Sequence, residues 1–195
     1  MTNFNEHALE MSIMELFTEE DYTYVSGDKI HRERTEVLLK EDLKQYLYNR
    51  YAQDGITPSE VDSIVLMLKS VSGTIYEANK TVYKMLCDGF IFNREDRSQK
   101  DLYIELIDFD TPENNIFKVV NQFEIGYGNN ERRIPDGIVF VNGIPVVVLE
   151  FKSAVEAAAK KIGLDPAVMA SPFITTIVDA VSLLIYFGIA SIVLL

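Results

Sequence analysis

The residues RIPDGIVFVNGIPVVVLEFK, numbered 133–152, contain the clearest structural signal in the chain. Two runs rich in β-branched residues, 138–141 and 145–151, flank the dipeptide Asn142-Gly143, and this pattern is the strongest short-range sign of a β-hairpin. The second run begins with proline and then holds four consecutive apolar residues, 146–149. A continuous apolar run is typical of a strand that is covered on both faces, so we expect a central strand here.

Residues with metal chemistry lie at the outer ends of the two runs. They are Asp136, just before the first run, and Glu150 and Lys152 at the end of the second. Two carboxylates can hold Mg²⁺, which polarises a phosphate and activates water, while a lysine can stabilise charge on the attacked phosphate. Side chains two residues apart on a strand point to the same face, so Glu150 and Lys152 can share one site. The three residues form the set found in PD-(D/E)xK nucleases.

The two carboxylates can meet at one metal ion only if they lie on the same face of the hairpin. A strict two-residue loop places Asp136 opposite Leu149 and sends Glu150 to the other face. A three-residue loop, Val141-Asn142-Gly143 with its glycine in the left-handed conformation, places Asp136 opposite Val148 and diagonal to Glu150. We therefore predict this loop, or a bulge of equal effect.

The chain before the hairpin changes from helical to alternating periodicity. Apolar residues at helical spacing predict helices over residues 5–20, 33–51, 57–68 and 74–87. The third of these has a strong start signal in Thr57-Pro58-Ser59-Glu60, where the threonine can cap and the glutamate can complete a capping box. Strands are predicted over residues 102–106 and 116–125. The expected fold class is therefore α+β, with N-terminal helices and a mostly antiparallel sheet.

Residues 1 to about 155 resemble the N-terminal region of the R (restriction) subunit of type I restriction-modification enzymes. The resemblance is carried by NEHALE (5–10), GDKIHRER (27–34), VNQF (120–123), RIPDG (133–137) and VNGIPVVVLEFK (141–152). It implies a restriction-endonuclease-like core of the PD-(D/E)xK type, with Asp136, Glu150 and Lys152 as nuclease residues. It also implies that Glu10, on the first helix, completes the site; a solvated helix face is the other interpretation of Glu10.

By the same resemblance, the activity class is Mg²⁺-dependent hydrolysis of DNA, and the partners are the modification and specificity subunits of a type I restriction complex. Family members continue after the lysine into a helix with a Gln-x-x-x-Tyr motif and into ATP-driven translocase domains, which this sequence does not match. No GxxxxGK[ST] loop occurs in the 195 residues, so no ATP site is expected in them. We therefore expect the chain to be inactive alone.

The charge of the chain limits how it can meet nucleic acid. With 18 basic and 30 acidic residues the net charge is −12, which argues against a free-standing nonspecific DNA binder, because phosphate neutralisation needs a basic face. The charge does not exclude a nuclease whose DNA is held by partner subunits. Cys87 is the single cysteine, so no internal disulfide can form, which fits a reducing cytoplasm.

The last thirty residues, 166–195, contain one charged residue, Asp179. About 20 apolar residues can span a bilayer, so this segment is predicted to form a single transmembrane helix after a junction at residues 156–165. Lys160 and Lys161 precede it and place the preceding nuclease part in the cytoplasm, tethered to the inner membrane, with the C-terminus outside.

Residues 158–195 also resemble the last transmembrane helix of MgtE-type magnesium transporters, through LDPA (164–167), SPFITTIVD (171–179) and LIYFGIA (184–190). In that family the corresponding aspartate lines the pore, so the resemblance implies a Mg²⁺ contact at Asp179. A pore needs several helices from two subunits, and this segment supplies one. Three interpretations stay open: a truncated R-subunit nuclease domain with an appended membrane helix, a magnesium-transporter fragment, and a non-functional chimera.

Overall fold

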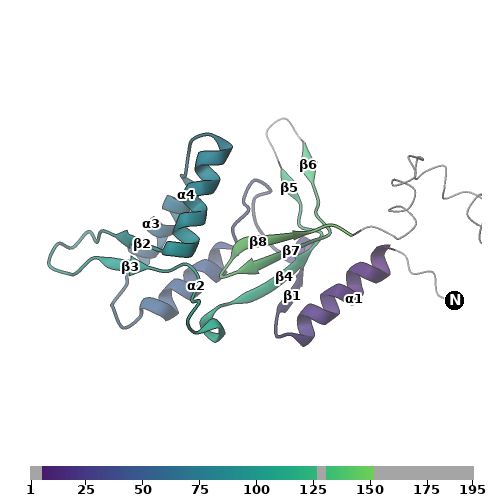
Figure 1. The fold of residues 1–195 in the computed structure, drawn as a ribbon, viewed down its shortest axis with the longest axis horizontal. Coiled ribbons are helices and arrows are strands. Elements are labelled where there is room, and N and C mark those ends of the chain that lie inside the picture. The colour runs from purple at the N-terminus through teal and green to yellow at the C-terminus, as the bar shows by residue number, and fades with distance from the viewer. Residues whose placement is uncertain (1–5, 127–130, 152–195) are drawn as a thin grey trace, which may run out of the picture. The chain divides into compact units, whose positions relative to one another are not determined.

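The computed structural model describes residues 6–126 and 131–151 (Figure 1). The chain divides into two units, Glu10–Glu150 and a second one made of Met1–Leu9 with Phe151–Leu195. Nearly all described residues belong to the first unit. Within the described ranges the α-helices are α1 (Glu6–Glu19), α2 (Lys40–Tyr51), α3 (Pro58–Lys69) and α4 (Ile75–Asp88), and the short 3-10 helices are η1 (Gly27–Lys29) and η2 (Pro112–Asn114). The strands are β1 (Thr23–Ser26), β2 (Phe90–Phe92), β3 (Leu102–Ile104), β4 (Phe117–Asn121), β5 (Ile125–Gly126), β6 (Arg132–Arg133), β7 (Gly137–Val141) and β8 (Ile144–Leu149).

The main sheet has the strand order β1-β4-β7-β8. β1 runs parallel to β4, whereas the β4–β7 and β7–β8 pairs are antiparallel. Two short antiparallel pairs, β2–β3 and β5–β6, form separate ladders. Figure 1 shows the four strands of the main sheet side by side, with α1 next to β1 and β4. The described part of the chain is thus an α+β fold with a mostly antiparallel sheet, as the sequence predicts.

The turn between β7 and β8 is the predicted Asn142-Gly143 hairpin. Both turn residues have positive φ, 51° and 76°, as a type I′ turn requires. The Asn142 side chain is fully buried; its Oδ1 accepts from Ile116 N at 2.7 Å and its Nδ2 donates to Leu106 O at 2.9 Å. On the other side of the turn, Leu39 N donates to Gly143 O at 2.8 Å. The turn therefore ties the sheet to the start of α2.

Two clusters of apolar side chains stabilise this unit. The larger cluster joins the buried faces of α2, α3 and α4 to the β2–β3 pair and reaches the main sheet through Ile144 of β8. The smaller cluster includes Phe123 and Phe140, whose ring centroids are 5.3 Å apart. The predicted capping box of α3 is formed, and its Glu60 also accepts from Arg94 Nε at 2.8 Å. This hydrogen bond lowers the pKa of the Glu60 carboxyl.

The helix predicted over residues 33–51 begins only at Lys40. The Arg32 guanidinium explains the difference, because it donates to the carbonyl oxygens of Glu33, Arg34 and Glu36. It also lies over the Phe123 ring, 3.5 Å from the ring centroid. With three carbonyl groups held by one side chain, this segment forms an irregular loop instead of the first turns of a helix.

In the described part of the sheet β8 is an edge strand, so the prediction of a central strand is wrong. β7 is the strand that pairs on both sides, and it is buried at all five of its positions. On β8, Val146, Val147 and Val148 are 41%, 47% and 59% exposed. The apolar run indicated a strand correctly, but its composition carried no information on the order of strands in the sheet.

The predicted transmembrane helix, residues 166–195, lies outside the described residues, together with Asp179 and the domain boundaries expected at 155 and 165. Among the helices that the structure describes, none is long and apolar enough to cross a membrane. The membrane helix and the junction before it stay predictions from the sequence.

Replacing Gly143 by alanine should lower the free energy of unfolding far more than the same change at Gly55. Both glycines have positive φ, 76° and 66°, so each alanine costs about 1 kcal/mol in backbone strain. At Gly143 the new Cβ would also lie 2.2 Å from Leu39 O, whereas nothing lies within 4 Å at Gly55. We expect a total loss of about 3 kcal/mol at Gly143 in chemical denaturation followed by circular dichroism. Equal losses for the two variants would contradict the described contact.

Candidate active site

β8 contains a β-bulge close to the turn that joins it to β7. Phe140 of β7 pairs with Pro145, but its neighbour Val139 pairs with Val147, so Val146 is an extra residue in β8. Pro145 stands next to the extra residue, and prolines within sheets are confined to bulges and edge positions. The prediction of a bulge is confirmed, and the three-residue loop given as its equivalent is wrong.

The bulge determines which face of the sheet each carboxylate occupies. Beyond it, the ladder ends with Gly137 opposite Leu149. Continued one step beyond the ladder, the same register would place Asp136 opposite Glu150, and side chains at opposed positions project from the same face. The loop predicted from the sequence would have placed Asp136 opposite Val148 instead. Without the extra residue, Glu150 would point to the other face.

Glu10 comes to the same end of the sheet on α1. One helical turn further on, Met14 packs against β7, with its Cε 2.9 Å from the position that a Cβ on Gly137 would take. Glu10 is 7% exposed, and its Oε1 accepts hydrogen bonds from the side-chain amides of Asn121 and Gln122 at 2.8 and 3.0 Å. Asn121 is the residue that pairs with Gly137 across β4 and β7. Glu10 is therefore buried at the carboxylate end of the hairpin, and is not part of a solvated helix face.

The two amide residues at the end of β4 are site residues that the sequence did not predict. The strand expected over residues 116–125 is interrupted here, because β4 ends at Asn121 and Gln122 has a positive φ of 52°. β1 ends so close by that a Cβ on Gly27 would lie 2.5 Å from Gln122 O. The segment VNQF was visible in the sequence, but its contact with Glu10 spans 111 positions, so no local pattern could reveal it.

The residue types predicted for the site suit a hard divalent cation. Carboxylate oxygens are the ligands that Mg²⁺ prefers, and Asp136, Glu150 and Glu10 carry such groups. Asp136 is half-buried and Glu150 is exposed. Within the described residues, no group of three or more His, Cys, Asp or Glu side chains is close enough to hold a metal ion as it stands. The other predicted site residues, Lys152 and Asp179, lie outside the part of the chain that the structure describes.

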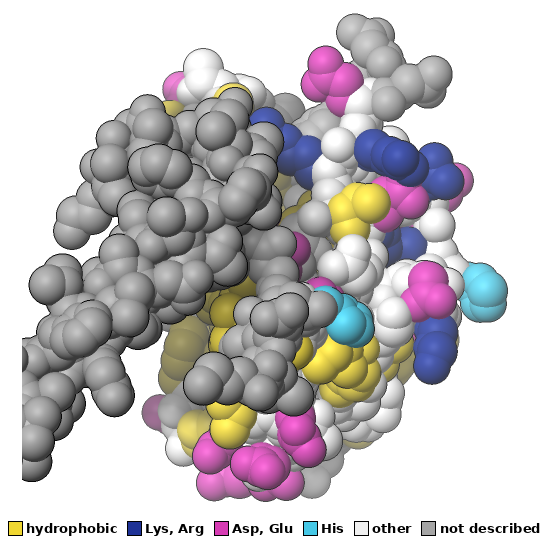
Figure 2. Space-filling model, turned by 90° about the vertical axis from the view of Figure 1, so that its right-hand side faces the viewer, with side chains coloured by type: hydrophobic (Ala, Val, Ile, Leu, Met, Phe, Trp, Pro, Cys, Tyr) yellow, Lys and Arg dark blue, Asp and Glu magenta, His cyan; other side chains and the backbone are white. Residues whose placement is uncertain are grey.

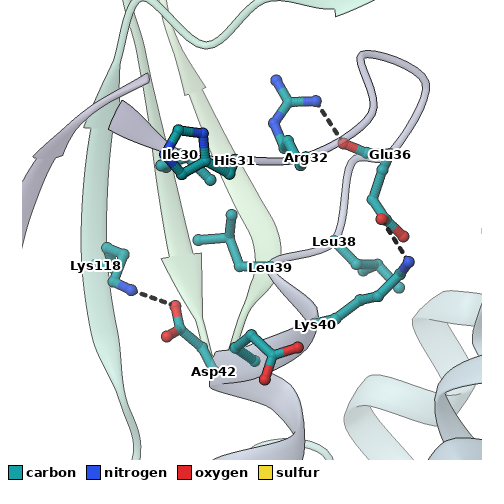
Figure 3. A pocket seen from close by; sticks show the side chains of 10 residues that line it. Ile30, His31, Arg32, Glu36, Leu38, Leu39, Lys40, Asp42 and Lys118 are labelled. Carbon is teal, nitrogen blue, oxygen red and sulfur yellow. Dashed lines mark hydrogen bonds and ion pairs between the residues drawn. The ribbon is translucent and has the colours of Figure 1, made fainter. Parts of the chain in front are cut away.

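A cavity of about 280 Å³ beside the 30–42 segment is separate from this site (Figure 3). None of the predicted site residues lines it. Its charged groups pair with one another: Lys118 lies 2.6 Å from Asp42, and Lys40 lies 2.5 Å from Glu36. Lys118 thus holds α2 against β4, and Lys40 holds the loop before α2 to the start of that helix.

Charged side chains of both signs are interspersed on the face that Figure 2 shows. Near β5 and β6, two exposed arginines share one acid: Arg34 Nε and Arg132 NH1 lie 3.5 and 3.8 Å from the Glu124 carboxylate. Exposed ion pairs of this kind contribute little to stability. Where this view shows described residues, they form no broad basic surface for a nucleic-acid backbone, in keeping with the net charge of −12.

These observations define an α+β domain with acidic side chains near one end of the β7–β8 hairpin. The family model of the type I restriction enzyme R protein N terminus matches residues 3–164, so the chain belongs to that family. It is 38% identical over 125 residues to the type I restriction enzyme HindI endonuclease subunit of Haemophilus influenzae, covering 63% of this chain and 12% of that protein. It is 30% identical over 158 residues to the putative type I restriction enzyme MjaIXP endonuclease subunit of Methanocaldococcus jannaschii. This match covers 76% of this chain and 15% of that protein. The matched region is thus a small part of the length of either relative.

A pair of introduced cysteines tests the register of the carboxylates. In a Cys87→Ser background, which removes the exposed native thiol, Asp136→Cys with Glu150→Cys should form a disulfide readily. Opposed positions in an antiparallel pair place Cβ atoms about 4.5–5.5 Å apart. The control combines Asp136→Cys with Leu149→Cys, which project from opposite faces and should cross-link poorly. Mild oxidation, alkylation and mass spectrometry measure both yields. A higher yield for the control pair would show that the bulge is absent.

Proposed function

We propose that this chain carries the nuclease centre of a type I restriction enzyme R subunit, which hydrolyses DNA phosphodiester bonds with Mg²⁺. The observation that supports the proposal is the bulge in β8, because the register beyond it, which ends with Gly137 opposite Leu149, would bring Asp136 and Glu150 to one face if it continued one step further. Membership in the R protein family supports it. Both relatives described above are named as endonuclease subunits.

Each carboxylate has a proposed role that follows from its position. Asp136 and Glu150 hold Mg²⁺ from two neighbouring strands, and Glu10 adds a third carboxylate from α1. The bound ion supplies polarisation of the phosphate and activation of a water molecule. Lys152 stabilises charge on the attacked phosphate, and strand alternation would put it on the same face as Glu150. The role of Lys152 rests on the sequence, because the residue lies outside the described part of the chain.

DNA is the proposed substrate, and other components of a type I complex are proposed to hold it. The chain has a net charge of −12, so the cations that neutralise the phosphates must come largely from elsewhere. The modification and specificity subunits are the proposed partners, with sequence recognition assigned to the latter. ATP binding is not proposed for these 195 residues, because they contain no GxxxxGK[ST] motif. Cleavage by the chain alone should therefore be weak.

The C-terminal segment is the subject of a separate proposal. We propose that residues 166–195 attach the chain to the inner membrane from the cytoplasmic side, on the basis of their apolar composition and of Lys160 and Lys161 before them. A single helix cannot form a pore, so conduction of Mg²⁺ is not proposed. The metal contact at Asp179 that the transporter resemblance implies stays a prediction from the sequence.

Removal of one carboxylate should weaken metal binding by the full chain in mild detergent. Mn²⁺ is the probe, because it accepts the same oxygen ligands and its free form is measured by electron paramagnetic resonance. We expect Asp136→Ala to raise the Kd for Mn²⁺ by about tenfold or more. The control is Glu131→Ala, which removes one exposed negative charge five residues earlier and should leave the Kd unchanged.

Plasmid nicking in the presence of Mg²⁺ provides the second readout for these variants. The chain alone is expected to be inactive on the whole, so the test concerns any residual nicking by the wild-type chain, which should disappear in Asp136→Ala and persist in Glu131→Ala. A wild-type chain that binds no Mn²⁺, or nicking that survives Asp136→Ala, would contradict the assignment of the nuclease centre.

Flotation with liposomes tests the membrane attachment and distinguishes it from aggregation. In a sucrose gradient the full chain should rise with the lipid, because residues 166–195 would insert, while a chain that ends at residue 165 should stay at the bottom. If the full chain also stays at the bottom, the membrane proposal is wrong.

A further inference from the structure

A relay of three side chains links β1, β4 and α1 beside the carboxylate site. The Tyr24 hydroxyl donates to Asn121 Oδ1 at 3.1 Å, and Asn121 Nδ2 donates to Glu10 Oε1 at 2.8 Å. Asn121 is 5% exposed, so the bond between the amide and the carboxylate is shielded from water. Hydrogen bonds to a carboxylate in such surroundings are among the stronger ones in proteins.

The chemistry of the amide explains why the relay is directional. A carboxylate only accepts hydrogen bonds, so Asn121 must turn its NH₂ group toward Glu10, which leaves its oxygen on the opposite side. The Tyr24 hydroxyl donates to that oxygen and thereby favours this orientation of the amide. In the reversed orientation an oxygen would face the carboxylate, and Asn121 would repel Glu10 instead of binding it.

Gln122 supplies a second donor to the same oxygen from a backbone conformation that glutamine rarely adopts. Its φ is 52°, and its Nε2 lies 3.0 Å from Glu10 Oε1. The close approach of Gly27 to the carbonyl groups of Asn121 and Gln122 accompanies this conformation. Left-handed backbone in a non-glycine residue costs free energy and clusters at functional sites. Two amides, one of them on a strained backbone, thus fix one carboxylate.

The hydrogen bonds from Asn121 and Gln122 to Glu10 are not needed to attach α1 to the sheet. Met14 already packs on Gly137, so the helix has an apolar contact with β7. A buried carboxylate is an expensive substitute for another apolar residue. Glu10 lies on α1 and contacts Asn121 of β4, the residue that pairs with Gly137 next to Asp136, and this position fits a role in holding a cation.

We propose that Asn121 is a positioning residue of the nuclease centre, which holds the Glu10 carboxylate in one orientation, and that Tyr24 sets the orientation of its amide. The inference rests on the proposed function, because it assigns Glu10 to the metal site. Asn121 acts through Glu10 and does not itself bind the metal ion.

A double-mutant cycle on Mn²⁺ affinity tests the proposal in the full chain. Asn121→Leu should raise the Kd for Mn²⁺ by about tenfold, as expected when the partner of a metal ligand is removed. Glu10→Gln should raise it at least as much. In the Glu10→Gln background, Asn121→Leu should have no further effect, because the residue through which Asn121 acts is already lost. Thermal unfolding without metal reports on the fold of each variant.

Tyr24→Phe provides a milder variant in case Asn121→Leu does not fold. It removes only the hydroxyl that orients the amide, so we expect the Kd for Mn²⁺ to rise a few-fold while the protein stays folded. Tyr46→Phe is the matched control. Its hydroxyl donates to Glu105 O at 3.2 Å in the helical part of the unit, and its loss should leave the Kd unchanged.

The outcomes separate this inference from the proposed function. If Glu10→Gln weakens Mn²⁺ binding but Asn121→Leu and Tyr24→Phe do not, the inference is wrong and the proposed function stands. If Asn121→Leu weakens binding equally in the Glu10→Gln background, Asn121 does not act through Glu10, and the inference is again wrong. If the wild-type chain binds no Mn²⁺, the proposed function fails and the inference fails with it.

Discussion

The pairing of β7 and β8 shifts by one residue directly after Pro145, where Val146 is the extra residue. Side chains alternate between the two faces of a strand, so this shift reverses the face of every residue of β8 beyond Val146. The same register, continued one step beyond the ladder, would bring Glu150 to the face of Asp136. One extra residue near the turn therefore decides which side chains face each other toward the opposite end of the hairpin.

The third carboxylate depends on contacts between parts of the chain that are distant in sequence. Gly137 leaves room for Met14, so α1 can approach β7 closely. One turn earlier on the helix, Glu10 then meets the amides at the end of β4. Because Asn121 pairs with Gly137, the residue that admits the helix and the residue that binds its carboxylate are neighbours across the ladder.

Local signals in the sequence predicted local structure well. The capping box at Thr57 and the turn at Asn142-Gly143 depend on residues within a few positions, and both are formed. Predictions failed where distant contacts decide, as in residues 33–39, where Arg32 is held by the Phe123 ring and Glu124 O and donates to three carbonyl groups of this segment. The edge position of β8 could not be read from its composition, because strand order depends on the whole chain.

In the candidate site, too, the local features were predicted from the sequence and the long-range contacts were not. The spacing of Asp136 and Glu150 indicated a hairpin pair, and the alternation of side chains was enough to require an even register, which the bulge provides. Glu10 was indicated by resemblance alone. Asn121 and Gln122 were not predicted, because their importance lies in a contact that spans 111 positions with a helix outside the sheet.

The bulge also limits how the length of this segment can change during evolution. Deletion of one residue between Gly143 and Glu150 would turn the glutamate to the other face, whereas a change of two residues would restore it. Homologous chains that keep both acids are therefore expected to differ here in steps of two. The number of residues between Gly143 and Glu150 would then be inherited as strictly as Asp136 and Glu150 themselves.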